Sequence, residues 1–329
     1  MTVFTTARTV RSALDPEPDA AMIEAVDVGK RFGSVPALES VSLQVPKGSV
    51  LGLLGHNGAG KTTLVNILTA MQPAGSGTAR VAGFDVAAQP KEVRKRIGLT
   101  GQFAAVDERL SGRENLTMLA RLLGADTSRA KARADELLTA FDLTEASGRQ
   151  ARTYSGGMRR RLDLAASLVG NPEVIFLDEP TTGLDPTSRR AMWEIVSGLV
   201  AEGTTVLLTT QYLDEADRLA DTITVLSAGR IVASGSAAEL KARVGQRTVT
   251  VVPPHGGDPE AGCAALRRAG MDPSVGRDGT AIITPIEASR DTAAVIRVLD
   301  EAGVDVAELA FGEPTLDDVY LALARRTAA

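Results

Sequence analysis

The chain has 329 residues, enough for two domains, and its hydrophobic fraction of 44% and charged fraction of 23% are those of an ordinary globular protein. Its formal net charge of −5 argues against broad, non-specific binding to nucleic acid. The one cysteine, Cys263, excludes an intrachain disulfide, and no cluster of Cys and His indicates a metal site. No apolar run approaches the roughly 20 residues that span a bilayer, and the start lacks the apolar stretch of a secretory signal. These features favour a soluble protein of a reducing cytoplasm.

The first 21 residues differ in character from the rest of the chain. Their Thr, Arg, Asp and Pro content predicts a disordered extension. Short β-type runs then alternate with helical spacing, which indicates an α/β core. Strands are expected at residues 22–27, 41–45, 49–54, 78–81 and 97–100, with a helix after residue 63 and a short charged helix at 91–96. Because apolar residues recur at helical spacing from 112 to 143, a helical subdomain is predicted at about residues 103–170.

The α/β pattern resumes after this insertion. Residues 174–177 and 205–208 are near-continuous apolar runs, typical of strands buried on both faces of a parallel sheet. A helix is expected between them at residues 189–201, and a hairpin at 223–226 and 230–233. Residues 245–329 are predicted to form a small α+β domain, with strands at 248–252, 280–283 and 306–310 and helices at 261–269 and 291–302.

The residues after the strand at 49–54 fit G-x-x-x-x-G-K-[ST], the pattern of a phosphate-binding loop. Glycines let the backbone curl so that N–H groups point at a bound anion, and the following helix presents its positive end. Lys61 is expected to reach the β- and γ-phosphates of a nucleoside triphosphate, and the Thr62 hydroxyl to ligate Mg²⁺. The expected phosphate-binding residues are Gly55, His56, Asn57, Gly58, Ala59, Gly60, Lys61, Thr62 and Thr63.

Two carboxylates follow the apolar strand at 174–177. A buried strand beside the phosphate loop would let Asp178 hold Mg²⁺ through its water shell. Glu179 could then polarise a water for attack on the γ-phosphate. With Lys61 at the phosphates, the pattern predicts hydrolysis of ATP.

A second element with anion-binding character lies at residues 154–159, far from the loop in the sequence. Ser155 is expected to cap a helix, and Gly156 and Gly157 to leave backbone N–H groups open to an anion. A single nucleotide site does not need a second anion-binding segment. It makes sense if Ser155, Gly156 and Gly157 cover the ATP held by another copy of the chain.

In order and spacing, these motifs resemble the nucleotide-binding domain of ABC transporters, over about residues 22–240. Residues 55–63 correspond to the Walker A loop, 174–178 to the Walker B strand and 155–159 to the LSGGQ signature, and the resemblance implies that residues 183–185 form the D-loop. It also implies that Glu179 is the catalytic glutamate and that Phe32 stacks on adenine. Gln102 corresponds to the Q-loop residue, which senses Mg²⁺ and touches the membrane subunit.

The sequence departs from this family where its switch histidine is expected, because Gln211 stands there. A glutamine amide can donate a hydrogen bond to the γ-phosphate but cannot become cationic or carry a proton. Hydrolysis is therefore expected to rest on Glu179.

With residues 111–116, 154–161 and 313–320, Gln211 makes the chain similar to the daunorubicin-resistance type of ATP-binding subunit. The resemblance implies export of a hydrophobic drug, antibiotic or lipid-like compound through a separate polytopic membrane subunit. It implies a chain that lies peripherally at the cytoplasmic face of the membrane, pairs with a second copy and binds no nucleic acid. Residues 245–329 would then serve accessory or assembly functions.

Three other functions are compatible with parts of the pattern. A soluble ABC-type ATPase of ribosomes or DNA usually carries two nucleotide domains or a long coiled coil, and this chain has one copy of each motif and no sustained heptads. A P-loop kinase leaves residues 155–157 unexplained. A catalytically weak regulatory subunit is suggested by Gln211 alone.

Overall fold

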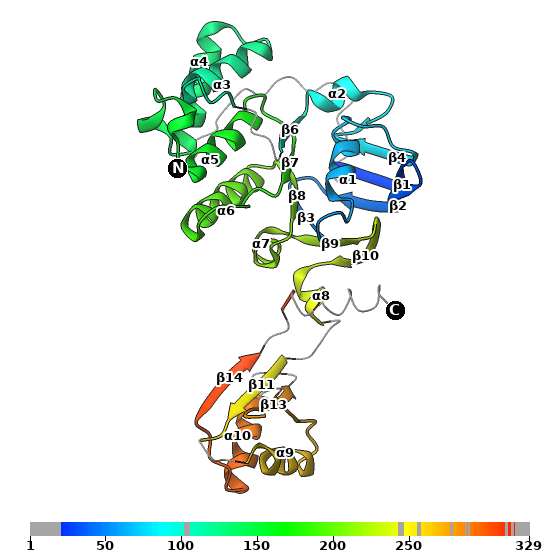
Figure 1. Ribbon diagram of the computed structural model, residues 1–329, viewed down its shortest axis with the longest axis vertical. Helices are drawn as coiled ribbons and strands as arrows, with labels where there is room; N and C mark the ends of the chain where they lie inside the picture. Colours follow the sequence, from blue (N-terminus) through cyan, green and yellow to red (C-terminus); the bar gives the residue numbers. More distant parts are fainter. Residues whose placement is uncertain are drawn as a thin grey trace. The chain divides into compact units, whose positions relative to one another are not determined.

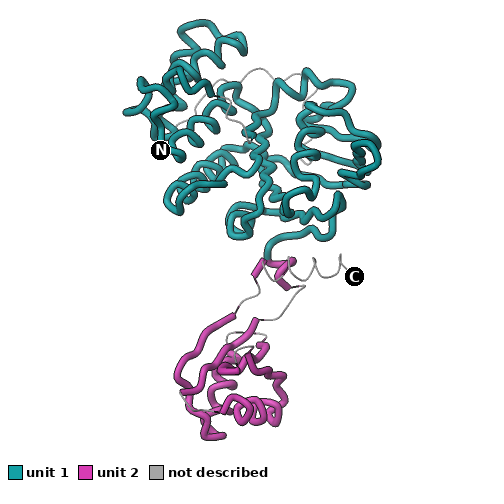
Figure 2. The backbone as a smooth tube through the Cα atoms, in the orientation of Figure 1, with its two compact units in different colours: residues 1–237 teal, residues 238–329 magenta. Residues whose placement is uncertain are grey.

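The computed structural model of the chain (Figure 1) describes residues 21–101, 106–242, 247–254, 258–276, 279–286, 288, 290–312, 315, 316 and 319. The chain divides into two compact units, residues 1–237 and 238–329, which Figure 2 distinguishes by colour. The expected extension at residues 1–21 lies outside the described residues apart from Ala21. Within the described part, no helix has both the length and the apolar character needed to cross a membrane.

A six-stranded sheet forms the centre of the first unit, with the strand order β10-β9-β3-β8-β7-β6. Its strands are β3 (Val50–Leu54), β6 (Ile97–Thr100), β7 (Val174–Asp178), β8 (Thr205–Thr210), β9 (Thr222–Ser227) and β10 (Arg230–Gly235). Neighbours are parallel except β9 and β10, which form the predicted hairpin. Every residue of β7 and β8 is buried, which confirms the prediction made from their apolar runs.

Helices lie on both faces of this sheet. Figure 1 shows α1 (Lys61–Leu68) on one side and α5 (Gly156–Ser167) and α6 (Pro186–Ala201) on the other. Alternate residues of one strand enter different cores: Phe176 joins the core on the α1 side, whereas Ile175 and Leu177 join the core shared with α5 and α6. The sheet is therefore held from both faces, which fixes where its strands end.

A smaller antiparallel sheet, ordered β2-β1-β4-β5, completes the α1 side. Its strands are β1 (Ile23–Phe32), β2 (Val35–Val45), β4 (Ser76–Val81) and β5 (Phe84–Asp85). The first strand was expected to end at Asp27, which has a φ of 49° and lies at a shift in the pairing register. The strand continues through this bulge to Phe32, because pairing resumes on its far side.

The predicted helical insertion contains two helices before α5, α3 (Gly112–Leu122) and α4 (Thr127–Ala140). Their single run of helical spacing is interrupted at Gly124, which has a φ of 96°. Ser111 and Glu114 form a reciprocal capping box that starts α3. The first unit also contains α2 (Pro90–Arg94), α7 (Leu213–Leu219) and the 3₁₀ turns η1 (Thr144–Ala146) and η2 (Ala151–Thr153).

The second unit begins within α8 (Ala237–Ala242), and the elements after this helix have the order β–α–β–β–α–β. Its elements are β11 (Arg247–Val252), α9 (Pro259–Arg268), β12 (Ser274–Val275), β13 (Ile282–Ile286), α10 (Asp291–Glu301) and β14 (Glu308–Gly312). The sheet is antiparallel, in the order β12-β13-β11-β14, which is the ferredoxin-like split arrangement. Cys263 is fully buried in its core. The strand predicted at 280–283 is found at Ile282–Ile286, after a turn at Gly279 with a φ of 72°.

Candidate active site

The pairing register brings the predicted catalytic segments to one edge of the sheet. Leu54, the last residue of β3, pairs with Thr210, and Asp178, the last residue of β7, pairs with Thr209. Because β3, β8 and β7 are adjacent and parallel, the residues that follow them emerge side by side. These are the phosphate loop, Glu179 and Gln211.

The phosphate loop has the backbone that its glycines allow. Gly58 and Gly60 have φ values of 83° and 107°, a region that other residues rarely adopt. A Cβ at Gly60 would lie 2.6 Å from the carbonyl oxygen of Ala37, and a Cβ at Gly55 would lie 2.5 Å from that of Leu226. The loop is thus packed against β2 and β9 on backbone atoms. His56, Asn57 and Gly58 face solvent, whereas Ala59 is buried.

Lys61 is drawn into this loop, with only 5% of its side chain exposed. Its ammonium donates hydrogen bonds to the carbonyl oxygens of Gly55 at 2.6 Å and His56 at 3.3 Å. Its Nζ also lies 3.7 Å from Oε1 of Glu179. Two residues that the sequence separates by more than a hundred positions therefore form an ion pair at the ends of β3 and β7.

Asp178 connects α1 to β8. Its Oδ2 accepts a hydrogen bond from the Thr62 hydroxyl at 3.4 Å, and its Oδ1 accepts one from the Thr209 hydroxyl. The sequence predicted Thr62 and Asp178 as partners at one ion, and the structure places them in contact. Thr209 was missed, although it stands directly before Thr210 and Gln211 in the switch segment.

Glu179 has an unusual backbone for a residue with a side chain. Its φ is 50°, in the left-handed region, where strain often marks a functional position. Its N–H lies 3.1 Å from both the carbonyl and the hydroxyl oxygen of Thr209. Oε2 of its carboxylate accepts a hydrogen bond from the Thr182 hydroxyl at 3.2 Å, and 13% of the side chain is exposed. The backbone of Glu179 is thus held by Thr209 of β8, and its carboxylate by Thr182 of the turn after β7.

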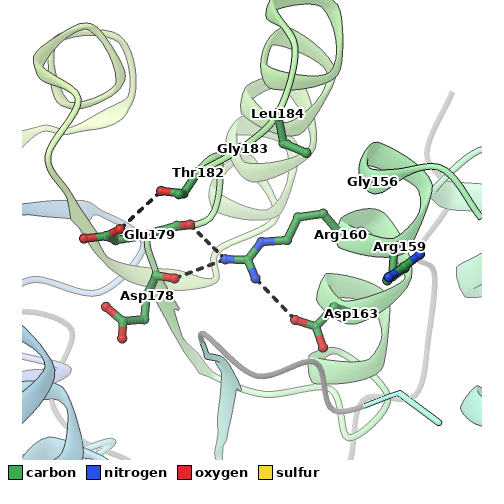
Figure 3. Close-up of a pocket in the computed structure, with 9 residues that line it drawn as sticks. All are labelled: Gly156, Arg159, Arg160, Asp163, Asp178, Glu179, Thr182, Gly183 and Leu184. Atoms are coloured by element: carbon green, nitrogen blue, oxygen red, sulfur yellow. Dashed lines mark hydrogen bonds and ion pairs between the residues drawn. The ribbon is translucent and has the colours of Figure 1, made fainter. Parts of the chain in front are cut away.

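Arg160 is a further residue that sequence reasoning did not identify. Figure 3 shows its side chain reaching from α5 toward the loop after β7. The guanidinium donates to four backbone carbonyl oxygens, those of Gly101 (3.1 Å), Asp178 (3.1 Å), Glu179 (2.9 Å) and Pro180 (2.8 Å). Burial lowers the pKa of Arg160, and nearby carboxylates, chiefly that of Asp163, oppose the shift. Main-chain acceptors leave no residue pattern by which this contact could be predicted.

The signature segment begins α5 as predicted. Ser155 caps the helix, and its hydroxyl accepts a hydrogen bond from the N–H of Met158 at 3.2 Å. Ser155 and Gly156 are exposed, and open space surrounds the position where a Cβ of Gly156 would lie. Tyr154 is instead buried, donates its hydroxyl to the carbonyl of Ala146 at 2.8 Å, and has its pKa raised by that burial.

The structure does not bring this segment to the phosphate loop of its own chain. Figure 1 shows α5 and α1 on opposite sides of β7 and β8. Among the described residues, no hydrogen bond or ion pair joins residues 155–157 to residues 55–63. The open N–H groups at the start of α5 are therefore available to a group outside the chain.

Three predicted residues lie around the edge of the site. Gln211 follows β8 and is exposed, shortly before α7, whose Asp214 forms an ion pair with Arg189 (3.2 Å). Phe32 is 51% exposed at the end of β1, with Nζ of Lys30 5.8 Å from its ring centroid. Gln102 lies outside the described residues.

A buried carboxyl group lies behind the switch segment. Glu215 of α7 is fully buried, and its Oε1 accepts a hydrogen bond from the Trp193 indole at 3.3 Å. Burial raises the pKa of Glu215, and hydrogen bonds from Thr210, Thr181 and Trp193 oppose that rise. The group thus links α6 to the end of β8.

The sequence of this chain is similar to those of known proteins. Residues 38–182 match the ABC transporter family. The chain is 50% identical over 295 residues to the daunorubicin resistance ATP-binding protein DrrA3 of Streptomyces coeruleorubidus, covering 89% of this chain and 93% of that protein. This chain belongs to the ABC transporter family of ATP-binding subunits, and its predicted membership and fold class are confirmed.

Two further members show how widely the likeness extends. The chain is 37% identical over 258 residues to the Nod factor export ATP-binding protein I of Burkholderia orbicola, covering 78% of this chain and 80% of that protein. The solved structure of an ATP-binding subunit of an ABC transporter covers 68% of this chain and 92% of its own, with a TM-score of 0.61 and 26% identity. The shared cassette therefore occupies about two thirds of the chain.

The buried Glu215 carboxyl generates a prediction about pH and stability. Its folded pKa lies above its unfolded value of about 4.3, so the folded state binds more protons than the unfolded state between the two pKa values. The free energy of unfolding should fall as pH rises through this window, by at most ~1.4 kcal/mol per pH unit. Glu215→Gln should remove this slope in urea unfolding measured from pH 4.5 upward.

The exposed Glu194 of α6 supplies the control for this measurement. Glu194→Gln should leave the pH dependence of wild-type stability in place. Parallel stability curves for the wild type and Glu215→Gln would contradict the prediction.

Proposed function

We propose that this chain is the ATP-hydrolysing motor of an exporter that moves a hydrophobic drug, antibiotic or lipid-like compound through a separate transmembrane subunit. As a member of its family, the chain is an ATP-binding subunit of an ABC exporter and an ATPase. The contact between Lys61, at the start of α1, and Glu179, directly after β7, carries the assignment of its active site, and the two side chains lie 3.7 Å apart.

Binding of ATP is assigned to the phosphate loop. Backbone N–H groups of this loop and the positive end of α1 would bind the phosphates. The Lys61 ammonium, which the structure shows on the loop carbonyls, can exchange these partners for the β- and γ-phosphate oxygens. Phe32, exposed at the end of β1, offers a ring on which adenine can stack.

The oxygens of Thr62 and Asp178 fit a magnesium ion. They lie 3.4 Å apart, and Mg²⁺ prefers carboxylate and other oxygen ligands, usually few from the protein and the rest from water and phosphate. Among the described residues no group of three or more His, Cys, Asp or Glu could hold a metal, which agrees with a site that relies on the nucleotide. Thr62 and Asp178, with Gln102 as a further predicted ligand, would hold the ion, and the ion would neutralise charge on the phosphates.

Hydrolysis is assigned to Glu179. Its carboxylate is fixed by Thr182 and faces the lysine that would hold the γ-phosphate. A carboxylate in this position can orient a water and accept its proton as the water attacks the phosphoryl group. The Gln211 amide can donate a hydrogen bond to the γ-phosphate.

Two copies are proposed to enclose two ATP molecules. Each nucleotide would lie between Lys61, Thr62 and Asp178 of one copy and Ser155, Gly156 and Gly157 of the other. Two observations support this arrangement: Ser155 and Gly156 at the start of α5 are exposed, and in Figure 1 α5 lies across the sheet from α1, which follows the loop of the same chain. Release of the γ-phosphate would remove the group that bridges the copies.

The chain is proposed to lie at the cytoplasmic face of the membrane, bound to a polytopic subunit that Gln102 contacts. The likeness to a daunorubicin resistance protein over most of both chains supports a hydrophobic cargo, and the likeness to a Nod factor export protein supports the outward direction. The second unit, residues 245–329 in the predicted division, is proposed to serve assembly.

Glu179→Gln tests the assignment of the catalytic base. The substitution keeps the size of the side chain but removes the proton acceptor, so steady-state ATP hydrolysis should be lost while ATP binding is retained. ATPase rate and nucleotide affinity are measured on the same preparation. A variant that hydrolyses ATP at the wild-type rate would remove Glu179 from the mechanism and favour a weak regulatory subunit.

Gln211→Ala tests the switch residue separately. Loss of a hydrogen bond to a charged phosphate should lower kcat by about tenfold to a hundredfold and leave some hydrolysis, because Glu179 remains. Gln211→His restores a donor and should return most of the rate. An unchanged kcat in Gln211→Ala would show that the residue is only a polar residue of the loop.

The membrane partner is tested by a tagged pull-down from detergent-solubilised native membranes, with bound proteins identified by mass spectrometry. A polytopic membrane protein should be recovered in near-equal amount with the chain. Untagged membranes provide the background. Recovery of ribosomal or DNA-associated proteins in its place would contradict export and favour a soluble ABC-type ATPase.

A further inference from the structure

A cavity of about 360 Å³ separates the start of α5 from the loop that follows β7. Its lining combines residues of the signature helix, such as Gly156 and Arg160, with Glu179 and Thr182 of that loop. Figure 3 shows Arg160 extending from α5 to the backbone of the opposite wall. Only 18% of its side chain is exposed. The two walls are thus joined by a guanidinium rather than by apolar packing at this point.

The carbonyl oxygens around Arg160 are placed to accept from the planar, forked set of N–H donors of a guanidinium. Its Nε and Nη2 bind three consecutive carbonyl oxygens, those of Asp178, Glu179 and Pro180, and its Nη1 binds that of Gly101. Asp163, one turn further along α5, lies 3.6 Å from Nη1 and supplies a counter-charge. A guanidinium offers five donors in fixed directions, which no other side chain matches.

The carbonyl of Glu179 is the contact with a direct consequence for the active site. Glu179 has a φ of 50°, a conformation that persists only where surrounding groups hold it. Its N–H is held by Thr209 and its carbonyl by Arg160 at 2.9 Å. The backbone that aims the carboxylate at Lys61 is therefore fixed from both sides, and one of the two sides belongs to α5.

Arg160 also lies close to the start of α5, in the signature segment. Gly156, at the exposed start of the helix, precedes it by four residues, which is about one helical turn. A displacement of the start of α5 therefore moves the guanidinium and pulls on the carbonyls of residues 178–180.

We propose that Arg160 is a positioning residue that holds Glu179 in its hydrolytic orientation and couples it to the signature segment of the same chain. The coupling rests on the proposed function, in which that segment contacts the ATP bound by the other copy. A movement of the signature segment on contact with the neighbouring nucleotide would then reach the backbone of Glu179 through Arg160.

The test compares substitutions of adjacent arginines in the full chain. Arg160→Met keeps a long apolar stem and removes every donor, whereas Arg160→Gln keeps one amide. Arg161→Met is the matched control, because Arg161 is the next residue of α5 and donates to Phe141 (2.9 Å) and Asp142, away from the site. Kinetic constants are expressed per ATP-binding site, so that any unfolded fraction does not enter the comparison.

Both Arg160 variants should lower kcat by about tenfold to a hundredfold while the Kd for ATP stays within about twofold. Arg161→Met should keep both constants within about twofold of the wild type. Arg160→Lys retains the charge but not the fork, so it should remain slow. An unchanged kcat in Arg160→Met, an equal loss in Arg161→Met, or full activity in Arg160→Lys would overturn the proposal.

Amide hydrogen exchange provides a measurement that does not depend on hydrolysis. Arg160→Met should speed exchange in the segment 178–184 by about tenfold or more, because the loop loses its anchor, and Arg161→Met should not. Unchanged exchange in Arg160→Met would overturn the positioning role. If the wild type hydrolysed no ATP but exchange responded as expected, the proposed function would fail while Arg160 would still be shown to hold the loop.

Discussion

The active site depends on the in-register ends of three buried parallel strands. β8 lies between β3 and β7, and the last residues of β3 and β7 pair with Thr210 and Thr209 at the end of β8, so the phosphate loop, Gln211 and Glu179 begin at the same edge. Apolar side chains hold these strands from both faces, with Phe176 in one core and Ile175 in the other. A slip of one residue would exchange these two side chains between cores and displace Asp178 from Thr62. Apolar packing on the two faces of the sheet therefore sets the positions of the polar groups at its edge.

Polar contacts at this edge of the sheet orient the residues at the ends of the strands. The Thr209 hydroxyl donates a hydrogen bond to the Asp178 carboxylate. The hydroxyl and carbonyl oxygens of Thr209 both accept from the N–H of Glu179. Arg160 acts on the same segment from the opposite side. Both residues act on backbone or on carboxylate oxygens and not on the nucleotide. They illustrate how catalytic side chains are aimed by neighbours that have no part in the reaction.

Features of the fold and of the site that depend on residues close together in the sequence could be predicted, whereas features that depend on distant residues could not. The strand at residues 97–100 and the cap at Ser155 were found at the expected positions, because both depend on residues next to one another. β1 was predicted too short, since resumed pairing after the bulge at Asp27 depends on a distant strand. Lys61, Asp178 and Glu179 were recognisable from local motifs, whereas Arg160 was not. Its carbonyl partners lie up to 59 positions away and carry no side-chain pattern.

The ion pair between Lys61 and Glu179 has a consequence for the resting protein. While the ammonium lies 3.7 Å from the carboxylate and on the loop carbonyls, the carboxylate proposed as general base is occupied and the lysine proposed to bind phosphate is turned inward. A triphosphate offers Lys61 a stronger anionic partner than these carbonyls, and its arrival frees the carboxylate for water. A diphosphate also offers Lys61 a β-phosphate, but it has no γ-phosphate on which the proposed general base could act. Under the proposed function, the lysine that pairs with Glu179 in the resting protein is therefore the group that a bound nucleotide would draw away.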